Sequence, residues 1–192
     1  SKDHPLNQKA VARRAAAELG GGYEDFSFLV VHLGGGISVG VHKKGKIVDV
    51  NNALDGDGPF SPERAGGVPA GSLIDMCFSG EYTKDEIRKR LVGGGGLMAY
   101  LGTNDGREVQ KRIKSGDTYA ELIYKTMAYQ IAKEIGAGAT VLKGEVDAIL
   151  LTGGVAYDTE FIGWVIERVG FIARVMVYPG EFEMIALTQG VL

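Results

Sequence analysis

The sequence predicts an α/β fold around a mixed five-stranded sheet, and three observations support this prediction. Three short strand-like runs follow one another through tight turns, which is typical of an antiparallel meander. Two later apolar runs are separated by helix-length segments, which favours helix-linked strands parallel to the first one. Hydrophobic residues make up 45% of the chain and charged residues 23%, which suits a packed core. We therefore expect helices on both faces of one sheet.

The expected helices and strands alternate along the chain. A first helix is expected over residues 4–19, with Asp3 as its N-cap, Pro5 in its first turn and Gly20–Gly22 at its end. The expected strands are residues 26–32, 37–42, 46–50, 146–151 and about 173–178. The later helices are expected at residues 70–78, 83–91, 105–115, 118–143 and 158–169, with a last one from Glu181. Residues 51–69 lack periodicity and are predicted to form a long loop, a kind that is usually functional or mobile.

Size and charge limit the classes of function. At 192 residues we expect a single domain, and the net charge of −3 argues against a nucleic-acid binder, which normally carries a basic face. The one cysteine, Cys77, excludes a disulfide framework and a multi-cysteine metal site. No apolar run approaches the ~18 residues of a membrane span, and the polar start Ser1–Asp3 does not resemble a signal peptide. We expect a cytoplasmic protein with no membrane partner.

The order of these elements has a parallel among known folds. A three-stranded meander followed by helix-linked strands is the ribonuclease-H-like arrangement, which the actin-like ATPases and sugar kinases share. The parallel concerns the fold, and function has to be argued from the residues of a site.

The first candidate site is HLGGGIS, residues 32–38. Three consecutive glycines, Gly34, Gly35 and Gly36, let backbone N–H groups turn toward one point and form an anion-binding nest. His32 and the Ser38 hydroxyl could then donate to a phosphoryl oxygen. A tight hairpin with a core histidine explains the same pattern equally well, so both interpretations stay open.

The second candidate site is the loop from residue 51 to 71. Arg64 could present its planar guanidinium to a phosphate or carboxylate, and this functional interpretation is favoured. Asp55 and Asp57 could hold a metal-bound water, but acids that cap turns of a solvated loop are favoured for this pair.

Two further candidate sites also lie at ends of predicted elements. Asn104, Asp105 and Arg107 could face a nucleotide from a helix N-terminus, although simple helix capping is favoured for this motif alone. Gly153 and Gly154 end a buried strand and could let the backbone approach a nucleotide closely. A structural glycine pair at a strand–helix turn would look the same.

Several stretches together resemble the butyrate kinases, which belong with the acetate kinases among the actin-like phosphotransferases. The resemblance covers nearly the whole chain, and HLGGGIS (32–38) and PFSPER (59–64) are its most specific parts. It also includes HPLNQKAVAR (4–13), AYLGTNDGREV (99–109), DAILLTGG (147–154) and YPGEFEM (178–184). The resemblance implies ATP-dependent phosphorylation of butyrate or a related short-chain carboxylate to an acyl phosphate, with Mg²⁺ required. The implied partners are therefore ATP or ADP and the carboxylate or acyl phosphate.

The resemblance also implies roles for individual residues. His32 and Gly34–Gly36 match the second phosphate-binding segment, and Arg64 matches the arginine that steadies the transferred phosphoryl group. His4 matches a histidine near the acyl phosphate. Asn104, Asp105 and Arg107 match nucleoside contacts, and Gly153 and Gly154 match the segment that holds adenosine. Glu183, and less surely Glu181, matches the acidic residue close to Mg²⁺. A histidine, an arginine, a metal and backbone amides suit phosphoryl transfer, which depends on positioning and charge neutralisation.

The chain departs from this family in length and at its start. Family members are about twice as long and have two lobes, and Asp3 and Pro5 replace residues that are common around the matched histidine. We expect a single nucleotide-binding lobe without the N-terminal lobe, with weak ATP or ADP binding and little turnover. Two other hypotheses stay open: a non-catalytic nucleotide-binding or folding-model domain, and an interaction protein with inert glycine loops. Apolar surface left by a missing lobe could also pair two copies of the chain as a homodimer.

Overall fold

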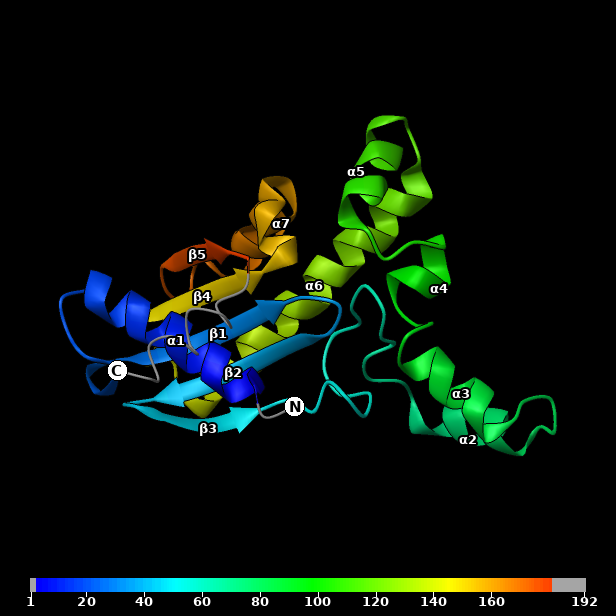
Figure 1. Cartoon of the computed structure of the whole chain (residues 1–192), viewed down its shortest axis with the longest axis horizontal. Coiled ribbons are helices and arrows are strands. Elements are labelled where there is room, and N and C mark those ends of the chain that lie inside the picture. Colours follow the sequence, from blue (N-terminus) through cyan, green and yellow to red (C-terminus); the bar gives the residue numbers. More distant parts are fainter. Residues whose placement is uncertain (1–2, 181–192) are drawn as a thin grey trace.

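The computed structural model describes residues 3–180, with side chains from Leu6 onward. In this part of the chain five strands form one sheet in the order β3-β2-β1-β4-β5 (Figure 1). The strands are β1 (Ser27–Leu33), β2 (Ile37–Lys43), β3 (Lys46–Val50), β4 (Ala148–Gly153) and β5 (Val175–Pro179). The β1–β2 and β2–β3 pairs are antiparallel, whereas β4 lies parallel to both β1 and β5. The predicted mixed five-stranded sheet with an antiparallel meander is confirmed.

The centre of the sheet is buried because helices cover both of its faces. Helix α1 (Asp3–Glu18) covers one face, and α6 (Thr118–Val141) with α7 (Thr159–Val169) covers the other (Figure 1). Every residue of β1 and of β4 is buried. This is the pattern of strands packed on both sides, and it explains why the sequence of each reads as a nearly continuous apolar run.

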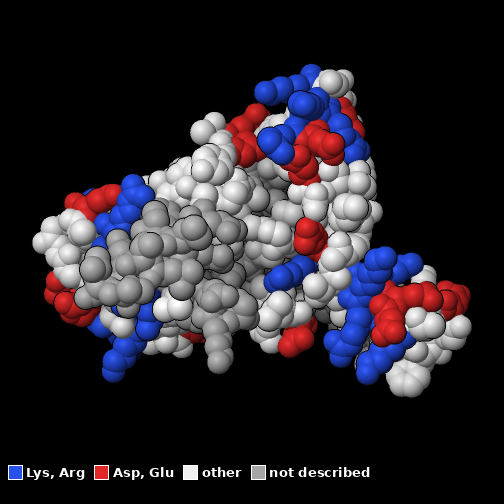
Figure 2. All heavy atoms as spheres, viewed as in Figure 1, with Lys and Arg blue, Asp and Glu red and all other residues white. Residues whose placement is uncertain are grey.

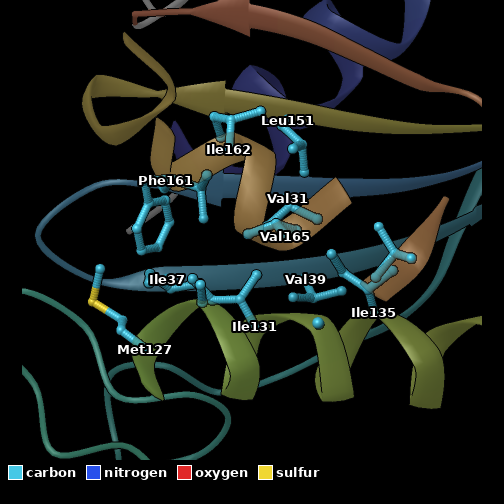
Figure 3. Packing of buried hydrophobic residues seen from close by; sticks show 14 of the residues in the cluster. Val31, Ile37, Val39, Met127, Ile131, Ile135, Leu151, Phe161, Ile162 and Val165 are labelled. Atoms are coloured by element: carbon cyan, nitrogen blue, oxygen red, sulfur yellow. The ribbon is translucent and has the colours of Figure 1, made fainter. Parts of the chain in front are cut away.

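Alternate residues of β1 belong to two different cores, since successive side chains of a strand point to opposite faces. Phe28 and Val30 pack on the α1 side, where Val11 and several alanines of α1 let the helix lie close to the sheet. Val31 points to the opposite face, toward α6 and α7 (Figure 3). The larger core there includes Ile37, Val39, Met127, Ile131, Ile135, Leu151, Phe161, Ile162 and Val165.

The segment between β3 and α6 leaves the sheet and forms an arm. It contains α2 (Ala70–Phe78), α3 (Lys84–Leu91), α4 (Leu97–Leu101) and α5 (Gly106–Lys114). Helices α2 and α3 lie together away from the sheet, and α4 and α5 lead back to the long helix α6 (Figure 1). Helix α2 contributes no buried residue. Among the helices within residues 3–180, none is long and apolar enough to cross a membrane.

The predicted elements are present, with shifts at their ends that are usual for sequence-based boundaries. Helix α1 includes Asp3, which was expected to precede the helix as its cap. Strand β4 begins two residues later than predicted and continues through Gly153, because β5 pairs with it as far as Gly153. Helix α4 was not predicted: its five residues, bounded by Gly96 and Gly102, are too few to show helical periodicity. The helix expected from Glu181 lies outside the described residues.

Candidate functional site

A cavity of about 1020 Å³ lies at one end of the sheet, where β1 and β4 finish. Its lining includes Gly34 and Gly35 after β1, Asn104–Arg107 at the start of α5, and Gly154 after β4. The carboxyl ends of parallel strands meet at the same edge of a sheet, which is why segments more than 100 residues apart share one cavity. All four candidate sites therefore contribute to this cavity, and the loop of residues 51–71 does so through Pro62 and Glu63.

Charged side chains gather on the surface of α5, at the side of this cavity, and on the surface of α2 and α3 (Figure 2).

Three polar or charged side chains pack against the turn Gly34–Gly36. A Cβ on the first glycine would lie 2.8 Å from Nε2 of His32, and one on the second would lie 3.2 Å from Oε2 of Glu63. A Cβ on the third would overlap the guanidinium group of Arg64. Each missing side chain thus leaves the space that a neighbouring histidine, carboxylate or guanidinium fills. Glycine is required here for close approach.

The loop that carries Glu63 and Arg64 is tied to this turn by hydrogen bonds. The backbone N–H of Glu63 donates to the carbonyl of Gly35 (3.2 Å), and the Ser61 hydroxyl donates to the same carbonyl (2.7 Å). The Ser61 hydroxyl also accepts from the backbone N–H of Arg64 (3.0 Å). Ser61 is fully buried, so this contact fixes the position of the loop beside the turn.

Asp105 both caps α5 and lines the cavity. Its carboxylate accepts from the backbone N–H of Arg107 (2.9 Å) and from the Arg107 guanidinium through Nε and Nη2 (both 3.1 Å). These hydrogen bonds hold the pKa of the Asp105 carboxyl below its ordinary value. The side chain of Asn104 donates from Nδ2 to Oε1 of Glu63 (2.8 Å), which links this segment to the loop. The capping interpretation is correct, and it is compatible with a place in the cavity wall.

The cavity residues that were not singled out from the sequence include Gln110, Tyr124 and Asp158. The Tyr124 hydroxyl donates to Asp158 (2.9 Å), and Nε2 of Gln110 donates to the same carboxylate (2.9 and 3.2 Å). Burial, and then the adjacent Asp158 charge, raises the pKa of Tyr124 far above its ordinary value, so this hydroxyl stays a proton donor. A Cβ at Gly106 would lie 2.7 Å from the Tyr124 oxygen. Of the residues in this group of contacts, only Gly106 belonged to a motif that the sequence analysis considered.

The two glycines at the end of β4, Gly153 and Gly154, have different structural roles. Gly153 is buried with a φ of +96°, and a Cβ there would lie 2.5 Å from the carbonyl oxygen of Leu33. Gly154 is exposed, lines the cavity, and has no atom within 4 Å of an added Cβ. Gly153 therefore permits the close contact of two chain segments, and Gly154 leaves the cavity wall open.

Residues 3–172 match the model of the acetokinase family. The chain belongs to this family. Among solved structures, it is similar to the acetate kinase of Porphyromonas gingivalis, with a TM-score of 0.88 and 24% identity over 98% of this chain and 54% of that one. It is also similar to a propionate kinase from Francisella tularensis, with a TM-score of 0.84 and 22% identity over 95% of this chain and 53% of that one.

These likenesses show the fold of this acetokinase-family chain, which is that of the actin-like ATPases. An ROK family protein from Streptococcus pneumoniae, crystallised with sucrose, shares it with a TM-score of 0.54 and 13% identity over 96% of this chain and 65% of that one. The predicted ribonuclease-H-like arrangement is confirmed. The chain spans about half the length of the acetate and propionate kinase structures that it matches.

Several predicted site residues lie outside the cavity lining. His32, Gly36, Arg64 and Gly153 are next to lining residues but are not part of the lining. Ser38 is buried on the α1 side of β2, where Nε2 of Gln8 donates to its hydroxyl (3.2 Å). Glu181 and Glu183 lie outside the described residues, and for His4 only the backbone is described, within α1.

The paired aspartates of the loop bind its own backbone and side chains. Asp57 accepts from the backbone N–H of Asn52 (3.0 Å), and Asp55 accepts from the Asn52 side chain (3.0 Å). These contacts support the turn-capping interpretation of the pair. Within residues 3–180, no group of three or more His, Cys, Asp or Glu side chains could by itself hold a metal ion.

Proposed function

We propose that this chain is the nucleotide-binding part of a kinase that phosphorylates butyrate or a related short-chain carboxylate with ATP, giving the acyl phosphate and ADP. The carrying observation is the convergence of Gly34–Gly35, Asn104–Arg107 and Gly154 on one cavity. Membership of the acetokinase family supports a carboxylate as the phosphoryl acceptor. The choice of butyrate rests on the resemblance of HLGGGIS and PFSPER to butyrate kinases.

The proposed reaction assigns the two ends of the cavity to different parts of the nucleotide. A carboxylate oxygen attacks the γ-phosphorus, the bond from that phosphorus to the β–γ bridging oxygen breaks, and ADP leaves. Backbone amides of Gly34–Gly36 and the Arg64 guanidinium would hold the phosphates, and His32 beside the turn would donate to a phosphoryl oxygen. The nucleoside would lie toward Gly154 and the start of α5. His4 and Ser38 remain proposals from the sequence, as contacts of the acyl phosphate and of a phosphate.

The chemistry of the cavity fits a nucleotide that carries Mg²⁺. This cation prefers hard oxygen ligands and is usually held by one or two carboxylates together with substrate phosphates. Carboxylates of Glu63, Asp105 and Asp158 line the cavity, and the resemblance adds Glu183. When bound, Mg²⁺ supplies neutralisation of the phosphate charge.

The length of the chain bears on its activity. Because it spans about half of the kinases that it matches, we propose that it forms one lobe of a two-lobed enzyme. A single lobe leaves a transferring phosphoryl group open to water on one side and supplies only part of the neutralising charge. We therefore expect the 192-residue chain to bind ATP or ADP weakly and to turn over far more slowly than a two-lobed relative. Binding with no turnover at all would favour the alternative of a non-catalytic nucleotide-binding domain.

Thermal unfolding without nucleotide, with ATP and with ADP, each in Mg²⁺, tests this proposal. A ligand that binds only the folded chain raises its stability, by about 2.7 kcal/mol at a hundredfold excess over Kd. Arg64→Ala should reduce the shift, and Arg90→Ala, on the α2–α3 arm, should leave it unchanged. No shift with either nucleotide would contradict the proposal and favour an interaction protein with inert loops. A coupled assay with butyrate, isobutyrate and acetate then identifies the acyl substrate.

We also propose that two copies of the chain form a homodimer, because helix α2 exposes apolar side chains. Ile74 and Phe78 of this helix are 56% and 86% exposed. The neighbouring helix α3 has acidic residues in its first turn and basic residues in its last turn. Antiparallel pairing of two arms about a two-fold axis would cover the apolar residues and place opposite charges against each other. A second copy of this chain therefore suits this surface.

A further inference from the structure

In two of the three carboxylates that line the cavity, both oxygens already accept hydrogen bonds. Both oxygens of Asp105 accept hydrogen bonds from Arg107. Both oxygens of Asp158 accept from Gln110, and they also accept from Tyr124 and from the backbone N–H of Phe161. Every oxygen of these two carboxylates therefore already has at least one hydrogen-bond donor.

Glu63 differs from both. Its Oε1 accepts from Nδ2 of Asn104 (2.8 Å), whereas its Oε2 has no hydrogen-bond donor within residues 3–180 and lies over Gly35, 3.2 Å from the position of an added Cβ. The backbone of Glu63 is held firmly, because its carbonyl accepts from the N–H groups of Gly93 (2.9 Å) and Gly95 (3.0 Å). One carboxylate oxygen is thus fixed and the other is presented to the glycine turn.

The free oxygen of Glu63 would repel phosphates bound at the glycine turn, unless a cation lies between them. A free carboxylate beside a turn that binds phosphates would repel them, since like charges a few ångströms apart are unfavourable at low effective dielectric. Arg64 lies against the next glycine of the turn, and Arg107, Lys111 and Lys114 line the cavity, but within the described residues none of these cations forms an ion pair with Glu63. A divalent cation between the Glu63 oxygen and the phosphates would turn the repulsion into attraction.

We propose that Glu63 is a ligand, directly or through one water, of the Mg²⁺ that accompanies the phosphates of a nucleotide in this cavity. This inference rests on the proposed nucleotide-binding function and adds a metal-binding residue to it. Asn104, which holds the other oxygen of Glu63, then acts as a positioning residue for the metal as well as lining the cavity.

Glu63→Gln separates a metal ligand from a purely structural residue. Glutamine keeps an oxygen that can accept from Asn104, but it removes the negative charge and most of the affinity for Mg²⁺. Calorimetric titration with ADP, in Mg²⁺ and in EDTA, should show that Mg²⁺ strengthens ADP binding to the unchanged chain. In the variant we expect this gain to fall about tenfold or more, while binding in EDTA is unchanged or tighter. Glu86→Gln, an equally conservative change on α3, should leave both values unchanged.

Replacement of Mg²⁺ by Mn²⁺ gives a readout that does not depend on activity. Electron paramagnetic resonance should show Mn²⁺ bound in the ternary complex with ADP, with weaker binding in Glu63→Gln. If Mg²⁺ strengthens ADP binding by the same factor in the unchanged chain and in Glu63→Gln, the assignment of Glu63 as a metal ligand is overturned, while the proposed nucleotide-binding function is not. Equal weakening of ADP binding in Mg²⁺ and in EDTA also overturns it, because Glu63 would then act only through Asn104. No ADP binding under any condition overturns the proposed function, and this assignment with it.

Discussion

The guanidinium group of Arg64 fills the space that a side chain on Gly36 would need. The glycine and the arginine, 28 residues apart, therefore form one structural unit. Gly36→Ala should displace the guanidinium and weaken ADP binding about as much as Arg64→Ala does, because both changes remove the same charge from the turn. The measurement is calorimetric titration with ADP in Mg²⁺.

Gly67→Ala is the matched control for this first prediction. It lies in the same loop as Arg64, and its added Cβ would make only an ordinary contact of 3.7 Å with the carbonyl of Gly58. We expect it to bind ADP like the unchanged chain. If Gly36→Ala bound ADP equally well, Arg64 would not depend on this glycine.

Gly153 and Gly154 should respond differently to alanine. At Gly153 the substitution combines a left-handed backbone conformation with a clash against Leu33, and we expect a loss of about 2 kcal/mol or more in the free energy of unfolding. At Gly154 there is open space, so the loss should stay within about 0.5 kcal/mol. Urea denaturation of the two variants measures both values, and equal losses would contradict this division of roles.

The contact between Gly106 and Tyr124 can be tested by a rescue. Gly106→Ala should cost about 1–3 kcal/mol of stability, because the new Cβ would lie 2.7 Å from the tyrosine oxygen. In a Tyr124→Phe background this oxygen is gone, and the nearest remaining atom is 3.6 Å away, so most of the cost should disappear. Tyr124→Phe alone should cost about 1 kcal/mol through its lost hydrogen bond to Asp158. Simple additivity in this double-mutant cycle would show that the two positions do not touch.

Stability should decrease in mild acid through His42, which is buried under α1. Gln8 Oε1 can only accept, so Nε2 of His42 donates to it (2.8 Å) and Nδ1 accepts from the Tyr23 hydroxyl (2.7 Å). Burial, and then the charge of Lys9, lowers the pKa of His42 to about 4, against 6.5 in an unfolded chain. Below pH 6.5 the unfolded state binds a proton that the folded state refuses, so stability falls as the pH drops from 6.5 toward 4, by up to about 3 kcal/mol.

The test compares how steeply the free energy of unfolding changes with pH in two proteins, and not their stabilities at one pH. Denaturation at several pH values between 4 and 7 should give a steeper decrease for the unchanged chain than for His42→Gln. Glutamine loses the titrating ring whatever its own cost to folding. Parallel curves would mean that His42 does not carry the effect.

The apolar face of α2 predicts the oligomeric state. If two arms pair, multi-angle light scattering should give the mass of two chains, and Phe78→Ser should give one chain with an unchanged nucleotide response. Phe78 is 86% exposed in a single copy of the chain, so its replacement should not lower the stability of that copy. A monomer at all concentrations for the unchanged chain would remove the homodimer.

Local patterns predicted most of the fold because buried strands and amphipathic helices each leave a recognisable apolar pattern in the sequence. The continuous apolar run of β4 indicated a strand buried on both faces, and the stripe through Met127, Ile131 and Ile135 indicated a helix that packs against one face of the sheet. Helix α4, with five residues, and the short helical turn at Gly154–Tyr157, with four, escaped prediction because each is little more than one turn long and cannot show a repeating pattern.

By itself, the sequence determined where candidate residue types stand along the chain: glycines at strand ends, an arginine in a long loop, and an acid that caps a helix. These follow from local backbone requirements, which a few neighbouring residues decide. Only the tertiary structure decided that Glu63, Asn104 and the glycine turn meet, and that Tyr124 and Gln110 hold Asp158 in the same wall. Parallel pairing of β1 and β4 brings these distant segments to one edge of the sheet, and no local pattern contains that long-range contact.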